Sequence, residues 1–175
     1  LVQKGELGEK FKGIRHEGRD LTFHQEPETI GTGGEMWNAR QLHQDRFILL
    51  RGDDFHPIDY AAIVAHHEQM SSPLTLTVTN EHSEMNLLHV DGRISQYDKS
   101  GTPPSEFNGY ESGTSVVEKA VLLEHGKEGK WSWEETVYPE MSMKATAHVD
   151  NTKFWDMGTP ERLERLEEFL NKTSF

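Results

Sequence analysis

Two aspartates and a run of glycines are the residues of this sequence whose types and spacing most suggest chemistry. Asp53 follows an apolar stretch and a glycine, and Asp156 lies between bulky residues late in the chain. A strand that ends in Gly-Asp delivers a carboxylate to the edge of a sheet, and two such carboxylates can share one hard metal ion. Upstream, Gly31-Thr32-Gly33-Gly34 predicts a tight turn whose main chain can approach a flat or charged ligand.

Each of these acids also has a structural explanation when it is taken alone. A Gly-Asp pair more often caps the segment that follows it, and Asp156 equally suits a turn before a helix. The ten histidines share no spacing typical of a metal site, so we expect them to lie at the surface or in the core.

In their order along the chain, four stretches resemble the sugar-1-phosphate nucleotidyltransferases, the pyrophosphorylase family. They are the Gly-Thr-Gly-Gly turn, the apolar strand closing on Gly52-Asp53, the Asp91-Gly92 turn leading to Asp98-Lys99, and Trp155-Asp156-Met157-Gly158-Thr159-Pro160. The resemblance runs from about Glu26 to Leu170. It implies transfer of a nucleotidyl group from a nucleoside triphosphate to a sugar 1-phosphate with release of pyrophosphate, most like the guanylyl- or uridylyl-transferring members.

The resemblance implies a role for each matching residue. Asp53 and Asp156 would hold Mg²⁺ as catalytic residues, and Lys99, the third catalytic residue, would steady the sugar phosphate. The residues implied in nucleotide binding are Gly31, Gly33, Gly34 and Gly52, and those implied in sugar binding are Glu111 and Gly113.

The sequence departs from the family's pattern at three places. The family opens with a strand and a loop reading roughly Gly-Gly-x-Gly-Thr-Arg-Leu, which cradles the triphosphate; we find no counterpart, and we expect a fold truncated at its N-terminus. The family's Glu-Lys-Pro reads Asp98-Lys99-Ser100, and its Asn-Ala-Gly reads Glu111-Ser112-Gly113. A carboxylate at position 111 would repel the substrate phosphate unless it accepts sugar hydroxyls. A catalytically inactive binding or regulatory homologue, or a fragment, therefore stays open beside the enzyme.

Alternating strands and helices must position these residues. The continuously apolar stretch 47–50 predicts a strand covered on both faces, and the alternation of 74–79 predicts a strand with one face toward the core. Asp91-Gly92 predicts a hairpin turn. Helices are expected after the glycines, over 58–70, over 118–124 and from Pro160, where Thr159 can cap and the apolar face is Leu163, Leu166, Phe169 and Leu170. We expect a single Rossmann-like α/β domain over 1–175, three-layered (α/β/α) around a mainly parallel sheet.

The composition of the chain argues against some classes of binding partner. A net charge of −12, from 18 basic and 30 acidic residues, makes nucleic acid and anionic membranes poor partners. No apolar stretch reaches the roughly 20 residues of a membrane helix, and the absence of cysteine is compatible with the cytoplasm. We expect a cytoplasmic protein that binds a nucleoside triphosphate and a sugar 1-phosphate; the base, the sugar and a homo-oligomeric state stay open.

Overall fold

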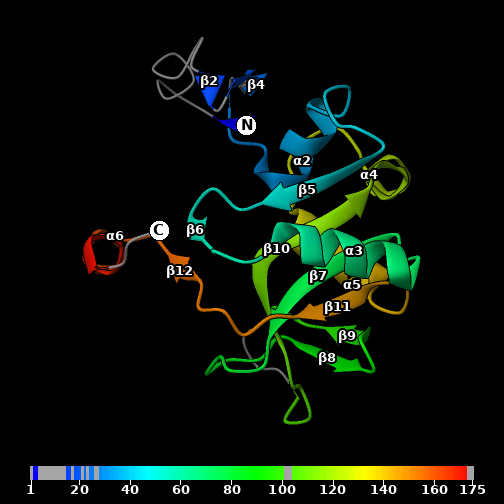
Figure 1. The fold of residues 1–175 in the computed structure, drawn as a ribbon. Helices are drawn as coiled ribbons and strands as arrows, with labels where there is room; N and C mark the ends of the chain where they lie inside the picture. The colour runs from blue at the N-terminus through cyan, green and yellow to red at the C-terminus, as the bar shows by residue number, and fades with distance from the viewer. Residues whose placement is uncertain are drawn as a thin grey trace.

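A six-stranded sheet forms the centre of the molecule (Figure 1). The computed structural model describes residues 2–3, 15–16, 18–20, 22, 24–25, 28–100 and 104–172. In spatial order, the strands of the sheet are β5 (Arg46–Leu50), β10 (Tyr110–Glu118), β7 (Leu74–Thr79), β11 (Thr146–Val149), β9 (Arg93–Tyr97) and β8 (Leu87–Val90).

The α/β fold class is confirmed, but the sheet is mixed rather than mainly parallel. Only β7 and β11 are parallel neighbours, because β10 lies antiparallel between β5 and β7. The expectation that 47–50 is covered on both faces is also wrong. Within the described part of the chain β5 has one neighbour, and its Ile48 and Leu50 are 38% and 53% exposed.

Helices cover both faces of the sheet, so the three-layer arrangement is confirmed (Figure 1). Helix α3 (Tyr60–Met70), capped by the Asp59 carboxylate, packs on one face. The other face carries α2 (Gly31–Asn38), α4 (Lys119–His125) and α5 (Trp133–Met141). The main core lies between these three helices and the sheet, and fully burying a large apolar side chain there stabilises the fold by about 1.5–3 kcal/mol.

Both faces of the central strand β7 are buried, although the sequence predicted one buried face. Its apolar residues Leu74, Leu76 and Val78 enter the main core, as the alternation predicts. Its threonines face the opposite side, and they are buried as well because α3 lies over them. The alternation of apolar residues therefore predicted the strand, but it did not predict that α3 buries its second face.

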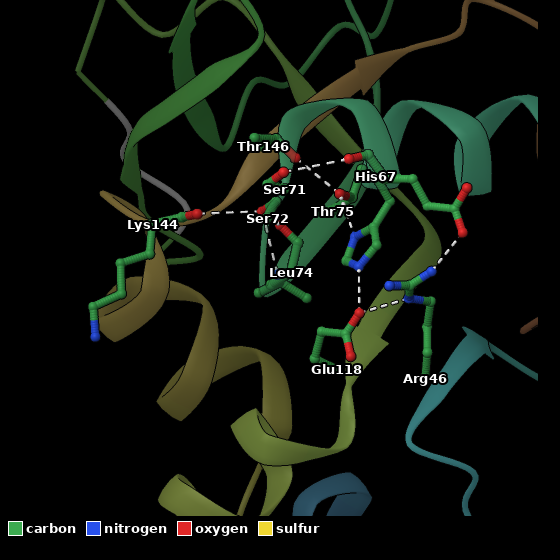
Figure 2. A network of polar contacts seen from close by, with 10 residues as sticks. Arg46, His67, Ser71, Ser72, Leu74, Thr75, Glu118, Lys144 and Thr146 are labelled. Atoms are coloured by element: carbon green, nitrogen blue, oxygen red, sulfur yellow. Dashed lines mark hydrogen bonds and ion pairs between the residues drawn. The ribbon is translucent and has the colours of Figure 1, made fainter.

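A polar network centred on His67 joins α3 to the threonine face of the sheet (Figure 2). The His67 ring lies 2.8 Å from the Thr75 hydroxyl through Nδ1 and 3.1 Å from Oε1 of Glu118 through Nε2. Thr75 is in turn 2.8 Å from the Thr146 hydroxyl, and Arg46 donates to Glu118. His67 is thus a core histidine, and its network joins α3 to β7, β10, β11 and β5.

The C-terminal elements extend from one end of the sheet. Two-residue strands β6 (Asp54–Phe55) and β12 (Trp155–Asp156) pair antiparallel, and α6 (Pro160–Lys172) follows. Thr159 caps α6 as predicted, since its hydroxyl accepts from the Arg162 amide at 3.3 Å. Of the predicted apolar face of α6 only Leu166 is buried, and Leu163 and Leu170 are exposed.

The remaining elements are short. The predicted hairpin is confirmed, with Asp91 and Gly92 both at positive φ between β8 and β9. Near the N-terminus, β1 (Val2–Gln3) pairs with β4 (His24–Gln25), and β2 (Arg15–His16) pairs with β3 (Arg19–Asp20). None of the helices among the described residues has the length and apolar character to cross a membrane.

Candidate active site

The two predicted metal ligands lie on neighbouring segments. Strand β5 leads into the turn that carries Asp53, and β6 follows at once. Because β6 pairs with β12, Asp54 is the register partner of Asp156, and the Met157 amide donates to the Asp53 carbonyl at 2.7 Å. Asp53 is exposed and Asp156 is half-buried. The tertiary fold therefore brings both acids to one end of the sheet.

These two carboxylates fit Mg²⁺ by their chemistry, with one complication at Asp156. Mg²⁺ is typically bound through one or two carboxylates, and substrate phosphates and water complete its coordination. The described residues contain no group of three or more His, Asp or Glu side chains arranged to hold a metal ion. The complication is that Asp156 accepts from the Gly158 amide at 2.6 Å and pairs with Arg162.

Beside the two acids, Arg51 links two buried glutamates. Its guanidinium donates to Oε2 of Glu111 at 2.6 Å, and its Nε lies 3.6 Å from Oε1 of Glu134. Burial alone would lower the pKa of Arg51, but these carboxylates outweigh it and raise that pKa. We call Thr32, Arg51, Asp54, Glu111 and Glu134 the central polar cluster.

Glu111 has no free carboxylate oxygen in this cluster. It is 2% exposed, its Oε2 accepts from Arg51, and its Oε1 accepts from the Gly113 amide at 2.8 Å. Burial raises the pKa of Glu111, against the lowering effect of Arg51. The sequence placed Glu111 at a sugar-binding position; the structure places it behind Arg51 as a buried countercharge.

Gly113 makes room for Asp54. It adopts a positive φ of 86°, and a Cβ built on it would lie 2.3 Å from Oδ2 of Asp54. Burial and the nearby acids Asp53, Glu111 and Asp156, opposed by Arg51, raise the pKa of Asp54 to about 6. A glycine here therefore lets a carboxylate approach the backbone of β10.

Lys99 contributes charge to the same region from the end of β9. Its side chain is exposed. Burial acts to raise the pKa values of Glu111 and Glu134, and the positive charge of Lys99 is one of the contributions that oppose this effect; the pKa of Glu111 stays raised on balance. The structure therefore places Lys99 near the cluster, where the resemblance implies a residue that steadies a phosphate.

The glycines do not form the predicted turn, because Gly31, Gly33 and Gly34 are the start of helix α2. A Cβ at Gly33 would lie 2.2 Å from the Trp131 ring, and one at Gly34 would lie 2.4 Å from the Gly129 carbonyl oxygen. These glycines permit close helix packing. Their nucleotide-binding role, like that of exposed Gly52, stays a prediction.

Sequence reasoning gave no role to Thr32, Arg51 and Glu134, three members of the central polar cluster. Thr32 donates to Oε2 of Glu134 at 3.0 Å, which connects the start of α2 to Arg51. The one available signal was Arg51 itself, a cation directly before Gly52-Asp53 at the end of an apolar strand. Helix α5, which carries Glu134, has no strong local pattern, so its approach could not be anticipated.

No family model matches the chain, but individual proteins are similar to it in sequence. The chain is 23% identical over 173 residues to a D-glycero-α-D-manno-heptose 1-phosphate guanylyltransferase of Aneurinibacillus thermoaerophilus, covering 95% of this chain and 74% of the relative. It is 25% identical over 164 residues to the enzyme of the same name from Campylobacter jejuni, covering 91% and 70%.

A solved structure shares the fold. HddC from Yersinia pseudotuberculosis, crystallised with GMP-PN, superposes with a TM-score of 0.70 at 23% identity, covering 93% of this chain and 71% of that one. The chain is therefore similar in sequence to two heptose 1-phosphate guanylyltransferases and shares the fold of HddC, in line with the resemblance carried by the four motifs.

Proposed function

We propose that this protein transfers a nucleotidyl group from a nucleoside triphosphate to a sugar 1-phosphate, in the manner of a guanylyltransferase. The observation that carries the proposal is the β6–β12 pairing, which brings Asp53 and Asp156 together from distant parts of the chain. Two relatives named as heptose 1-phosphate guanylyltransferases support guanine as the base of the donor nucleotide and a heptose 1-phosphate as the acceptor.

In the proposed reaction, an oxygen of the sugar phosphate attacks the α-phosphorus and the bond to pyrophosphate breaks. Asp53 and Asp156 would hold Mg²⁺, which supplies neutralisation of the phosphate charge when it is bound. The protein's own work is to hold the two substrates in line, since phosphoryl-type transfers depend mainly on positioning and electrostatics. Lys99 adds a positive charge beside the cluster.

The test is release of pyrophosphate by the purified chain with Mg²⁺, each of four nucleoside triphosphates, and a panel of hexose and heptose 1-phosphates. We expect release with GTP and a heptose 1-phosphate, and we expect Asp53→Asn to lower kcat at least about a hundredfold. Asp53 is exposed, so the variant should retain the circular dichroism spectrum and unfolding midpoint of the parent. Glu164→Gln removes one exposed carboxylate from α6 and is the matched control.

One observation favours a second candidate, a homologue that binds the substrates without turning them over. Asp156 is already paired with Arg162, so a metal ion must compete with an internal cation for this carboxylate. Saturable GTP binding without pyrophosphate release from a folded chain would support this candidate. Turnover that Asp53→Asn leaves unchanged would contradict the assignment of Asp53 as a metal ligand.

A further inference from the structure

A cavity of about 700 Å³ is lined by Asp156 and by residues to which the proposed site gives no role, such as His82, Tyr110 and Arg165. It is bounded by the loop after β7, by the stretch 151–156 and by α6. This volume lies within the range of about 300–1,000 Å³ that is typical of small-molecule sites. The question is which ligand its walls would take.

One wall of the cavity is a stack of three rings from three separate segments. His82 and Tyr110 stack with ring centroids 3.9 Å apart, and Phe154 lies nearly parallel to Tyr110 at 5.9 Å. Nδ1 of His82 lies 2.9 Å from the Glu84 carbonyl oxygen and 3.1 Å from the Glu84 amide nitrogen, so the backbone of Glu84 holds that ring in place. An outer ring face of such a stack would present an apolar surface to the C–H face of a ring-shaped ligand.

The helical wall of the same cavity carries two cations. Arg162 and Arg165 are three residues apart on α6, so their side chains emerge on the same face of the helix. Arg162 pairs with Asp156, whereas no ion pair joins Arg165 to another of the described residues. Guanidinium groups bind phosphate through paired hydrogen bonds. A ligand with a phosphate group therefore suits this wall.

Two acids that line the cavity add a third requirement. Glu81 and Glu84 also line it, and carboxylates accept hydrogen bonds from hydroxyl groups but repel a free phosphate. Ring surface, hydroxyl acceptors and guanidinium groups together match a phosphorylated sugar better than an inorganic anion. The position of Glu111 also favours sugar binding in this cavity rather than at Glu111. That residue is buried and both of its carboxylate oxygens already accept hydrogen bonds, so they do not face a sugar hydroxyl.

We propose that this cavity receives the sugar 1-phosphate, with the sugar ring against the stack of His82, Tyr110 and Phe154 and the phosphate toward Arg162 and Arg165. The inference rests on the proposed function and moves sugar recognition away from Glu111 and Gly113. Asp156 borders the cavity, so the acceptor phosphate would lie next to the end of the sheet where Asp53 and Asp156 meet.

The experiment compares Arg165→Gln with Lys172→Gln, which removes an equal charge from the same helix outside the cavity. KM for D-glycero-α-D-manno-heptose 1-phosphate and KM for GTP are measured by pyrophosphate release. Calorimetry on the full chain without GTP gives Kd for the same sugar phosphate and for inorganic phosphate. Because a charged hydrogen bond is lost, we expect Arg165→Gln to raise KM and Kd for the sugar phosphate about tenfold or more. KM for GTP should stay within about twofold of the parent.

A second variant tests the aromatic wall. His82→Ala should weaken binding of the sugar phosphate and leave binding of inorganic phosphate unchanged. Equal sugar-phosphate constants for Arg165→Gln, Lys172→Gln and the parent would overturn the proposal, as would equal affinity of the parent for sugar phosphate and inorganic phosphate. If no pyrophosphate is released at all, the proposed function fails, while the binding constants still decide whether the cavity takes a sugar phosphate.

Discussion

At the scale of single residues, the charge balance of the site depends on Arg51. Its guanidinium is the countercharge of Glu111, whose side chain is 1% exposed, and it also approaches Glu134. A buried carboxylate that loses its partner costs more than the pair itself contributes, since the remaining charge is left without water or a cation. Arg51 therefore stabilises the fold as well as shaping the site.

We expect Arg51→Met to lower the free energy of unfolding by about 3 kcal/mol, because Glu111 is left buried without its countercharge. Adding Glu111→Gln should recover part of this loss, since Gln can still accept from the Gly113 amide but carries no charge. Urea unfolding measures both, with exposed Arg93→Met as the control. Losses that simply add in the double variant would contradict a coupled pair.

A second residue prediction concerns acid stability. Burial raises the pKa of Glu118, but the hydrogen bonds from Arg46 and His67 outweigh it, so its folded pKa lies below the ordinary value of 4.5. A carboxyl group with a lowered folded pKa contributes stability above its unfolded pKa, and this contribution is lost as the pH falls through the folded pKa. The stability advantage of the parent over Glu118→Gln should therefore shrink as the pH falls below about 4.5.

This prediction is measured by urea unfolding at a series of pH values from about 7 to 3. Glu164→Gln, which changes an exposed carboxyl group on α6, should keep a constant difference from the parent over the same range. A constant difference for Glu118→Gln as well would mean that the Arg46–Glu118–His67 network does not couple to protonation of Glu118.

At the scale of elements, the close contact of α2 with the segment around Trp131 holds Thr32 against Glu134. The Gly33 amide donates to the Trp131 carbonyl at 3.1 Å, and the Trp133 amide donates to the Thr32 hydroxyl at 3.0 Å. This approach requires glycine on the contact face of the helix. The glycines thus position the central polar cluster through packing, whatever they contribute to nucleotide binding.

Gly33→Ala should lower the free energy of unfolding by about 1–3 kcal/mol, the range typical of overpacking, because the new Cβ would lie 2.2 Å from the Trp131 ring. The variant gains helix propensity, so a loss of stability can come only from this contact. Gly52→Ala is the control, since a Cβ at Gly52 meets nothing within 4 Å. Thermal unfolding distinguishes the two variants. Equal unfolding midpoints would show that α2 can shift to accept the new Cβ without loss of stability.

At the scale of the whole molecule, the C-terminal helix is held less firmly than the sheet. The described contacts of α6 include the Trp155–Phe169 ring stack, the Arg162–Asp156 pair and the buried side chain of Leu166. Strand β7, by contrast, is buried along its whole length between two neighbours. Since α6 lines one wall of the proposed acceptor cavity, its stability bears directly on ligand binding.

We expect the amides of α6 to exchange with deuterium faster than those of β7, because elements with few buried contacts open locally at low cost. Hydrogen exchange followed by mass spectrometry measures this difference, and Leu166→Ala should increase it. The heptose 1-phosphate should slow exchange in α6 if that helix closes on the ligand. Exchange as slow in α6 as in β7 would show that the two elements unfold together.

Local sequence patterns predicted many of the helices, strands and turns. The alternation of 74–79, the Asp91-Gly92 turn and the Thr159-Pro160 helix start each predicted an element that the structure confirms. The failures came where distant segments decide the outcome. The sheet is mixed because β10 is inserted between β5 and β7, and the glycines enter a helix because Trp131 packs on them.

By itself, the sequence predicted most of the elements, the order of the motifs that resemble the family and the two acids that the proposed function needs, because these depend on local periodicity and on the order of residues along the chain. Only the tertiary structure determined which side chains contact each other in the site. Arg51 and Glu111 are 60 positions apart, and Thr32 and Glu134 are 102 apart. Such contacts depend on strand order and helix packing, which no local pattern encodes, and so the central polar cluster and the cavity beside Asp156 emerge only when the chain is folded.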